Sequence, residues 1–415
     1  MTESVITPQT PYELNPEFPN LAGFNRMERA MAILAHPHSI KKVAPKTYTI
    51  KSQAGFVSYV VKEENDRFTC TCPDHLLNHT ECKHILALKE YLKQKELDLH
   101  ARRAENPRAI DWSNYTLAQK NEGELFPIYL KQLVDLIDEP ETAPRRGRKS
   151  VPLADNVFCA VSKVASQLSS RRAYKTVVDA EKANLIERQY NYNGVNIFLN
   201  REDITPLLRE LLRMSAAPLA QIEDKFAIDA SGFGTYQYGD WCANKHGTKR
   251  EHTFVKAHVA CGVMSNIITD AVVTDSSVGD MNVLPTLVEG TAGRFDTREV
   301  SADAGYASNK NYEAIQKAGA VGYIAFKGNT TGKGCPAWRD AFTRFVMNRA
   351  EFEKHYNMRN NVETVFSSIK AKYQEKLKSK NAVAQINELY CKLIAYNISV
   401  VIRMAHTDDI EVMFR

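Results

Sequence analysis

The sequence contains no apolar run long enough to cross a membrane. The longest run near the C-terminus, LIAYNISVVI at residues 393–402, is too short to span a bilayer and carries Asn397 and Ser399. The first residues, MTESVITPQT, have neither the positive start nor the apolar core of a secretory signal peptide. We therefore expect a cytoplasmic protein with no membrane partner.

The sequence also lacks a strong excess of either charge and a framework of paired cysteines. Its net charge of +5 is too small on its own to indicate a polyanion partner. Of the eight cysteines, Cys70, Cys72 and Cys82 cluster and the others are scattered. This distribution suits a metal site in a reducing compartment better than a set of disulfides.

The chain is long enough for several domains with cores of their own. Its 415 residues, 44% hydrophobic and 25% charged, are typical of globular protein. The order of patterns predicts an α/β fold, in which a mixed sheet flanked by helices is preceded by a helical domain and a small β-rich domain. The expected parts are a β-rich domain at 1–105, a helical connector with a basic linker at 106–150, a helical domain at 151–220, the mixed α/β domain at 221–402 and a tail at 403–415.

Two pairs of metal-binding side chains follow strand-like segments at 47–72 and precede a helical run. Residues i and i+2 of an extended segment point to the same side, so Cys70 and Cys72 direct two thiolates to one point, and Cys82 and His84 can complete a tetrahedron. Three thiolates and one imidazole suit zinc, and a closed set of four ligands predicts a structural site. The alternative is a small core that contains free thiols.

This Cys-x-Cys and Cys-x-His arrangement after a β-hairpin resembles the SWIM zinc-finger family over residues 46–92. The resemblance implies structural zinc and a module that binds DNA or protein, without deciding between them. His75 and His79 lie in the spacer between the two pairs and are weaker candidate ligands.

A short basic segment marks the expected boundary before the helical domain. Its candidate DNA-binding residues are Arg145, Arg146 and Arg148, with Lys149 beside them. Such a segment suits the narrow minor groove of A·T-rich DNA and resembles a partial AT-hook. The alternative is a solvated linker. The helical residues 151–220 are expected to bind DNA or to mediate dimerisation.

Acidic residues stand out in the strand-rich segment after residue 225. KFAIDASGFG reads as an apolar strand that ends at Asp229, and REVSADAGYAS as a strand with Asp303 near its end. A carboxylate at the end of a buried strand is costly unless it is paired or binds a metal. With the two strand ends side by side and Glu363 above them on a helix, the three carboxylates would form a site for two magnesium ions. The alternative is that the aspartates only cap strands or form turns.

Glu363 belongs to a stretch without proline or glycine that predicts one helix from Tyr356 to Lys370. At about 100° per residue, Tyr356, Arg359, Glu363 and Lys370 fall within roughly 60° of one another on this helix. An ordinary amphipathic surface helix is the alternative. However, the spacing Tyr-x2-Arg-x3-Glu-x6-Lys matches the signature of the DDE transposases of bacterial insertion sequences, and the sequence is similar to that family over about 221–402. The resemblance implies that Tyr356, Arg359 and Lys370 contact the DNA backbone at the transposon ends.

The same resemblance implies an RNase H-like core in which Asp229, Asp303 and Glu363 are the catalytic residues and hold two magnesium ions. Double-stranded DNA, at the element ends and at the target, is the implied partner, and a homo-oligomer on DNA is implied by the need to hold two ends together. The protein would be bacterial and associated with the nucleoid when bound. The short interval between Asp303 and Glu363 argues against the large β-rich insertion that some members carry.

Two further basic stretches favour a DNA substrate. The loop at 241–252 carries Lys249 and Arg250 as candidate DNA-binding residues, and the segment at 370–380 is rich in lysine. Contacts from such residues to phosphates weaken with salt, although each stretch is equally compatible with a solvated face. His258 is expected on a strand, as a core residue or a support for the site rather than a catalytic group.

The leading hypothesis is a cut-and-paste DNA transposase, which hydrolyses the element ends and then joins the freed 3′-hydroxyl to target DNA. A nuclease of the same fold without strand transfer is the first alternative. The second is a domesticated DNA-binding regulator in which the zinc module and the basic linker act and the acidic residues are vestigial.

Overall fold

The structure, a computed structural model, divides into two compact units. The first comprises Met1–Asn121 with His406–Asp409, and the second comprises Glu122–Ala405 with Ile410–Arg415. The finer division into five parts stays a prediction. The residues described are 25–36, 38–44, 46–53, 57–64, 67–105, 111–140, 150–188, 191–235, 254–328, 330–408 and 410–414.

The first unit is built on a four-stranded antiparallel sheet of order β1-β2-β3-β4. Helices α1 and α3 pack together, and α3 packs against β3 and β4, so that Ile33, Ile50 and Leu88 share one core. Asn25 and Glu28 cap the start of α1 reciprocally. The elements are α1 (Arg26–Ala35), β1 (Ile40–Ala44), β2 (Thr47–Lys51), β3 (Ser58–Glu64), β4 (Arg67–Cys70), α2 (Pro73–Asn78) and α3 (Lys83–Glu105).

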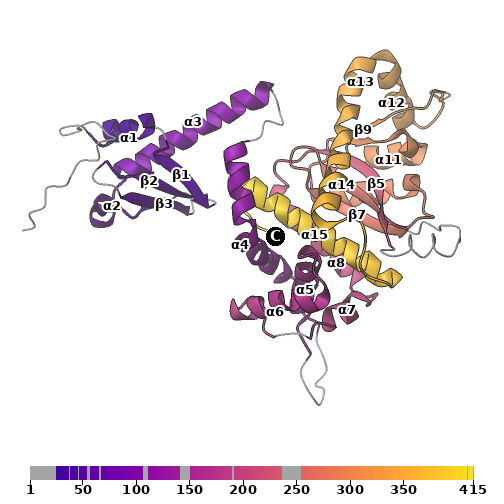
Figure 1. Cartoon of the computed structure of the whole chain (residues 1–415). Coiled ribbons are helices and arrows are strands. Elements are labelled where there is room, and N and C mark those ends of the chain that lie inside the picture. Colours follow the sequence, from indigo (N-terminus) through magenta and orange to yellow (C-terminus); the bar gives the residue numbers. More distant parts are fainter. Residues whose placement is uncertain are drawn as a thin grey trace, which may run out of the picture. The chain divides into compact units, whose positions relative to one another are not determined.

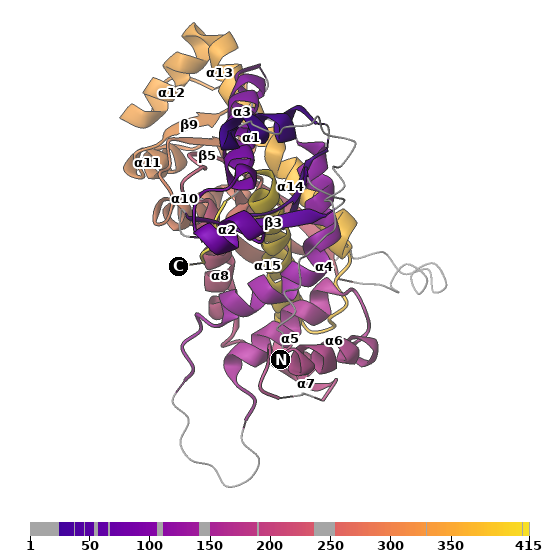
Figure 2. The same cartoon turned by 90° about the vertical axis from the view of Figure 1, so that its left-hand side faces the viewer.

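The second unit begins with helices and continues into a mixed sheet. None of the helices in the described ranges is long and apolar enough to cross a bilayer. Figure 1 and Figure 2 show α5, α6 and α7 at the end of this unit opposite to α12 and α13. The first helices, of which α4 starts before the division between the units, are α4 (Trp112–Val134), α5 (Leu153–Ala165), α6 (Ser170–Lys182), α7 (Gly194–Leu199) and α8 (Thr205–Ser215).

The sheet of the second unit has five strands in the order β7-β6-β5-β8-β9. The pairs β5–β6 and β6–β7 are antiparallel, whereas β5–β8 and β8–β9 are parallel. Helix α10 precedes β8 and helix α11 precedes β9, so a helix leads into each strand that completes a parallel pair. The elements are β5 (Lys225–Gly234), β6 (Phe254–Gly262), β7 (Ile268–Asp275), α10 (Leu284–Ala292), β8 (Glu299–Ala302), α11 (Asn309–Lys317) and β9 (Val321–Ile324).

Helices from the C-terminal part complete the packing around this sheet. Residues of α10, α11 and α12 form one core cluster with Ile228, Val300 and Ile324 of the strands. Helix α14 packs against β5 and β6, while Asn397 of α15 accepts from the backbone N–H of Ile268 in β7. The remaining elements are α12 (Pro336–Met347), α13 (Arg349–Tyr356), η4 (Asn357–Arg359), α14 (Asn360–Tyr373) and α15 (Ala382–Thr407).

The predicted fold class is confirmed, but two local expectations were wrong. Strand β5 does not end at Asp229, because the small residues after it still pair with β6 as far as Gly234. The helix from Tyr356 to Lys370 is not continuous, because a 3-10 turn over Asn357–Arg359 separates α13 from α14. Asn361 donates to the carbonyl of Met358 at 2.9 Å in this turn, a local bond that competes with the helical pattern.

Candidate active site and candidate metal centre

Asp229 and Asp303 follow paired residues on two neighbouring parallel strands. Ile228 of β5 is opposite Ala302 of β8, and each aspartate is the next residue. Because successive strand residues face opposite sides, Asp229 faces away from the core cluster that contains Ile228. Asp303 is exposed and opens a 3-10 turn (η3, Ala304–Tyr306). The two aspartates therefore follow neighbouring positions of paired strands, although only Asp303 stands at a strand end.

The carboxyl of Asp229 is partly buried, and the charges around it include two further carboxylates. Burial raises the pKa of its carboxyl, and the charges of Asp303 and Asp280 raise this pKa further. The backbone N–H of Ala230, which donates to Asp229 at 2.8 Å, and the guanidinium of Arg359 act in the opposite direction. The site thus holds negative charge that a bound cation would balance.

Glu363 lies in the first turn of α14, next to Arg359 of the signature. Arg359 Nη1 donates to Glu363 Oε1 at 3.0 Å, and the Arg359 guanidinium lies 5.6 Å from the centre of the Tyr356 ring. The turn η4, which carries Arg359, packs against both β5 and β8. The structure therefore brings Tyr356, Arg359 and Glu363 together above the strands that carry Asp229 and Asp303.

The carboxylates of Asp229, Asp303 and Glu363 do not converge as a set of metal ligands in this structure. Among the described residues, the one group of three or more metal-binding side chains with ligand atoms within 4.8 Å of one another is a Cys/His group. The Glu363 side chain is 58% exposed and is bound to Arg359. Carboxylate oxygens are the ligands that magnesium prefers, so the donor set fits this metal once Glu363 leaves Arg359.

Lys370 lies further along α14 and has different neighbours. Its ammonium pairs with Glu375 at 3.1 Å and lies 5.4 Å from the centre of the Phe233 ring, near the end of β5. The fourth residue of the signature is thus beside the strand that carries Asp229.

His258 is a core residue, one of the two roles expected for it. Its side chain is fully buried in β6, and its Nε2 lies 3.0 Å from the hydroxyl of Thr274. Burial lowers the pKa of His258 to about 4. The ring is therefore neutral at physiological pH and is not a charged catalytic group.

Asp280 is a residue near the site that sequence reasoning missed. Its Oδ1 lies 3.4 Å from His258 Nδ1 and pairs with the ammonium of Lys256. Burial, followed by the charges of Asp229, Asp280 and Asp303, raises the pKa of Tyr306. In the sequence, Gly279-Asp280 reads only as a turn, and nothing there indicates its partners on a distant strand.

Five predicted DNA-binding residues lie outside the described residues. These are Arg145, Arg146 and Arg148 of the basic linker and Lys249 and Arg250 of the loop between β5 and β6.

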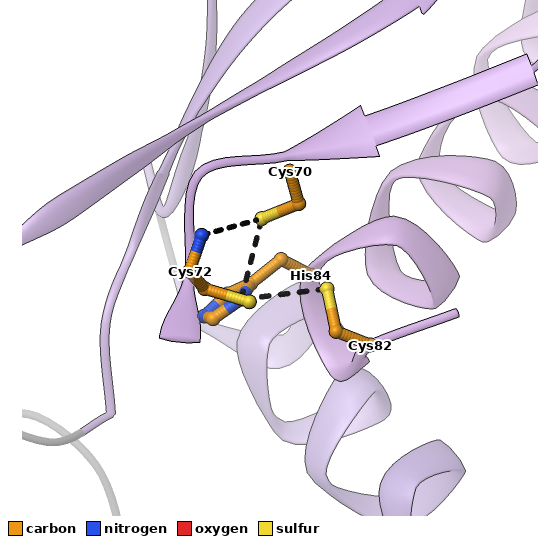
Figure 3. Close-up of side chains that lie close together, drawn as sticks. All are labelled: Cys70, Cys72, Cys82 and His84. Atoms are coloured by element: carbon orange, nitrogen blue, oxygen red, sulfur yellow. Dashed lines mark hydrogen bonds between the residues drawn. The ribbon is translucent and has the colours of Figure 1, made fainter. Parts of the chain in front are cut away.

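The Cys/His group is in the first unit, and it contains the four predicted zinc ligands. The Sγ atoms of Cys70 and Cys82 lie 3.9 Å and 3.8 Å from His84 Nδ1, and all four ligand atoms lie within 4.8 Å of one another. Figure 3 shows the side chains converging from the end of β4, from the residue before α2 and from the start of α3. All four residues are buried, and the centres of the His84 and Tyr59 rings lie 4.9 Å apart.

The pKa shifts of these thiols are compatible with a site that binds a cation. The hydrogen bond between Cys70 and Cys82 lowers the pKa of Cys82 to about 3 and raises the pKa of Cys70. Burial raises the pKa of Cys72. A zinc ion would replace the protons that these sulfurs share. The two spacer histidines are elsewhere: His75 Nδ1 lies 2.8 Å from the carbonyl of Thr80, and His79 ends α2 in a left-handed conformation.

One comparison with known proteins matches part of the second unit. Residues 221–398 match the family model described as a transposase DDE domain. No curated protein and no solved structure shows a significant match to the chain. The matched range covers the whole five-stranded sheet, whose mixed order is that of the expected RNase H-like core, and it includes the three acidic residues and the signature on α13 to α14. Residues 221–398 are therefore a transposase DDE domain.

Proposed function

We propose that the chain is a cut-and-paste transposase that binds the ends of its element, hydrolyses phosphodiester bonds there and transfers the freed strands to target DNA. The placement of Asp229 beside Asp303 on paired parallel strands, within a transposase DDE domain, carries this proposal. The raised pKa of Asp229, to which the charge of Asp303 contributes, and a third carboxylate on the overlying helix support it.

In this proposal Asp229, Asp303 and Glu363 would hold two magnesium ions, whose charge would favour activation of the attacking oxygen and stabilisation of the leaving oxygen. The oxygen of water bonds to phosphorus, and the bond from phosphorus to the 3′ oxygen breaks, leaving a 3′-hydroxyl. That hydroxyl oxygen then bonds to a target phosphorus and displaces a 3′ oxygen of the target. Arg359 and Lys370, with Tyr356, contact backbone phosphates of the element end.

The other parts of the chain have supporting roles in this proposal. Cys70, Cys72, Cys82 and His84 hold a structural zinc ion in a module that binds DNA or protein. The linker residues Arg145, Arg146 and Arg148, and the loop residues Lys249 and Arg250, are further proposed DNA contacts. The active form is a homo-oligomer that holds two element ends together.

The test is excision in cells from a plasmid that carries the gene with its native flanking DNA. Wild type is compared with Asp303→Asn and with Asp296→Asn, a matched control because Asp296 is an exposed carboxylate of the same domain, 72% exposed and paired with Arg298. Precise loss of a defined segment with wild type and with the control, but not with Asp303→Asn, is expected. Purified Asp303→Asn should bind element ends nearly as wild type does, so a loss of end binding in a folded variant would contradict the catalytic role.

Products of the purified protein separate the proposal from its alternatives. Magnesium-dependent breaks together with joined strands support transposition. Breaks without joined strands support a nuclease, and DNA binding without cleavage supports a regulator.

A further inference from the structure

The second unit, which we call the catalytic unit, has a lysine-rich loop between α14 and α15. Buried charged side chains hold this loop in place. We call residues 374–380 the clamped loop. Glu388 of α15 accepts hydrogen bonds from the backbone N–H of Lys378 at 2.9 Å and of Ser379 at 2.7 Å. Lys392, one turn further along α15, donates from Nζ to the carbonyls of Gln374 at 2.9 Å and Lys376 at 3.0 Å.

The clamp uses charges that the protein has taken out of water. The side chains of Glu388 and Lys392 are 3% and 1% exposed and lie 4.0 Å apart. Burying such a pair is unfavourable unless hydrogen bonds satisfy the remaining donors and acceptors, and here the loop backbone supplies them. Gln374 has a φ of 64°, which is rare for a residue other than glycine. The loop conformation is therefore imposed by α15 and is not a local preference of its own sequence.

The clamped loop lies against the end of the strand that carries Asp229. The backbone N–H of Leu377 donates to the carbonyl of Gly234, the last residue of β5, at 2.8 Å, and the Leu377 side chain is buried. Glu375 of the loop pairs with Lys370 of the signature. The loop thus joins the catalytic strand to the signature helix.

Besides Gln374 and the paired Glu375, this loop exposes two basic side chains. Lys376 and Lys380 are exposed, and neither forms an ion pair with any residue in the described ranges. Lys378 is instead turned inward and donates to the carbonyl of Gln167. A merely solvated lysine-rich loop has no need of two buried charges to fix its backbone.

We propose that the clamped loop binds backbone phosphates of the DNA strand beside the catalytic carboxylates, with Lys376 and Lys380 as contacts and Glu388 and Lys392 as positioning residues. The inference rests on the proposed function, since it names the surface that the DNA substrate covers. Glu375 holds Lys370 until a phosphate replaces it.

The contacts are tested by fluorescence anisotropy of the full chain with a labelled random-sequence duplex over a series of salt concentrations. Each phosphate contact contributes about 0.9 to the slope of log affinity against log salt, so Lys376→Ala with Lys380→Ala should reduce this slope by about 1.8. The matched control is Lys310→Ala with Lys317→Ala, two exposed lysines on α11. A wild-type slope in the first variant overturns the proposal, and arginine at positions 376 and 380 should restore the slope.

The clamp is tested with Glu388→Gln combined with Lys392→Met, which removes both buried charges together and leaves neither unpaired. Trypsin should cleave after Lys376 and Lys380 faster in this variant, and the slope should fall as in the lysine variant. Faster cleavage with an unchanged slope overturns the positioning role.

A measurement on wild type covers the case in which the clamp variant does not fold. Duplex DNA should protect Lys376 and Lys380 from trypsin, and unchanged cleavage at these residues in a saturated complex overturns the proposal. Wild type that excises DNA but shows no such protection removes this inference alone. Wild type that neither binds nor cleaves DNA removes the proposed function as well.

Discussion

Arg359 and Glu363 form an ion pair across one helical turn, with Nη1 and Oε1 3.0 Å apart. We propose Glu363 as a metal ligand and Arg359 as a DNA contact, so this ion pair joins two residues with different proposed partners. If these proposed roles hold, metal binding to Glu363 should free Arg359 for a phosphate, and DNA binding to Arg359 should free Glu363 for the metal.

Replacing Arg359 by glutamine should separate these two effects. Magnesium should bind the DNA-free protein about two- to fivefold more tightly, since a partly exposed ion pair is worth up to about 1 kcal/mol. DNA cleavage should fall, because a phosphate contact is lost. Calorimetric titration with magnesium measures the first effect. Arg349→Gln is the control, since it removes a similar pair, Arg349 with Glu353, from the neighbouring helix α13. Weaker magnesium binding by Arg359→Gln would contradict this competition.

Much of the catalytic unit was predictable, because its strands and helices differ clearly in hydrophobic pattern. The position of Asp303 followed from a short strand that ends before small residues. Asp229 was placed wrongly at a strand end, since Ser231, Gly232 and Gly234 favour a turn locally. Their pairing with β6 is a tertiary effect that overrides this preference.

Other features depend on contacts that have no trace in the local sequence. A helical wheel assumes uniform geometry, so it gave no sign of the turn over Asn357–Arg359. Strand β1 was missed because the adjacent Lys41 and Lys42 break the alternation of apolar and polar residues. Asp280 was missed because its partners, Lys256 and His258, belong to β6. By contrast, the group of three cysteines and one histidine was predicted because two residue pairs at short spacing define it.

Removing the charge of Asp229 should stabilise the metal-free protein. The folded-state pKa of this carboxyl is raised by burial and by Asp303, so its contribution to stability is lost as pH rises through that pKa, and at neutral pH the ionised group is unfavourable. Asp229→Asn should raise the free energy of unfolding by about 0.5–2 kcal/mol in EDTA, at the expense of activity. Thermal melts of the full chain measure this.

Magnesium provides the complementary measurement on the same variant. The metal should raise the melting temperature of wild type and of Asp296→Asn, and it should leave Asp229→Asn unchanged. An equal response of all three proteins to magnesium would place the metal elsewhere.

Removing zinc should unfold the first unit alone. Chelation, or Cys82→Ser, leaves buried thiols without the cation that balances them, and the sheet β1–β4 should become susceptible to protease while the DDE domain stays intact. Zinc content and limited proteolysis measure the two effects. Cys335→Ser, at a half-buried cysteine of the other unit, is the control and should keep its zinc. A protease-resistant first unit after metal removal would favour the alternative of a small core with free thiols.

The buried imidazole of His258 should make the catalytic unit sensitive to mild acid. Its pKa falls from 6.5 to about 4 on folding, because burial disfavours the charged ring. Above pH 6.5 the ring is neutral in both states and its contribution is complete. As pH falls from 6.5 to 4, the unfolded chain binds a proton that the folded chain does not bind. The free energy of unfolding therefore falls by at most about 3 kcal/mol.

His258→Gln should remove this part of the acid sensitivity, because glutamine keeps a polar group near Thr274 but does not titrate. The variant should lose about 1–2 kcal/mol at pH 7.5, since a buried site is repacked, and its curve of stability against pH should be flatter than that of wild type between pH 6.5 and 4. Urea unfolding followed by the fluorescence of the buried Trp338 measures both curves in the catalytic unit. Parallel curves would show that the neighbouring Asp280 allows the ring to take up its proton in the folded state, and that the acid sensitivity arises from other groups.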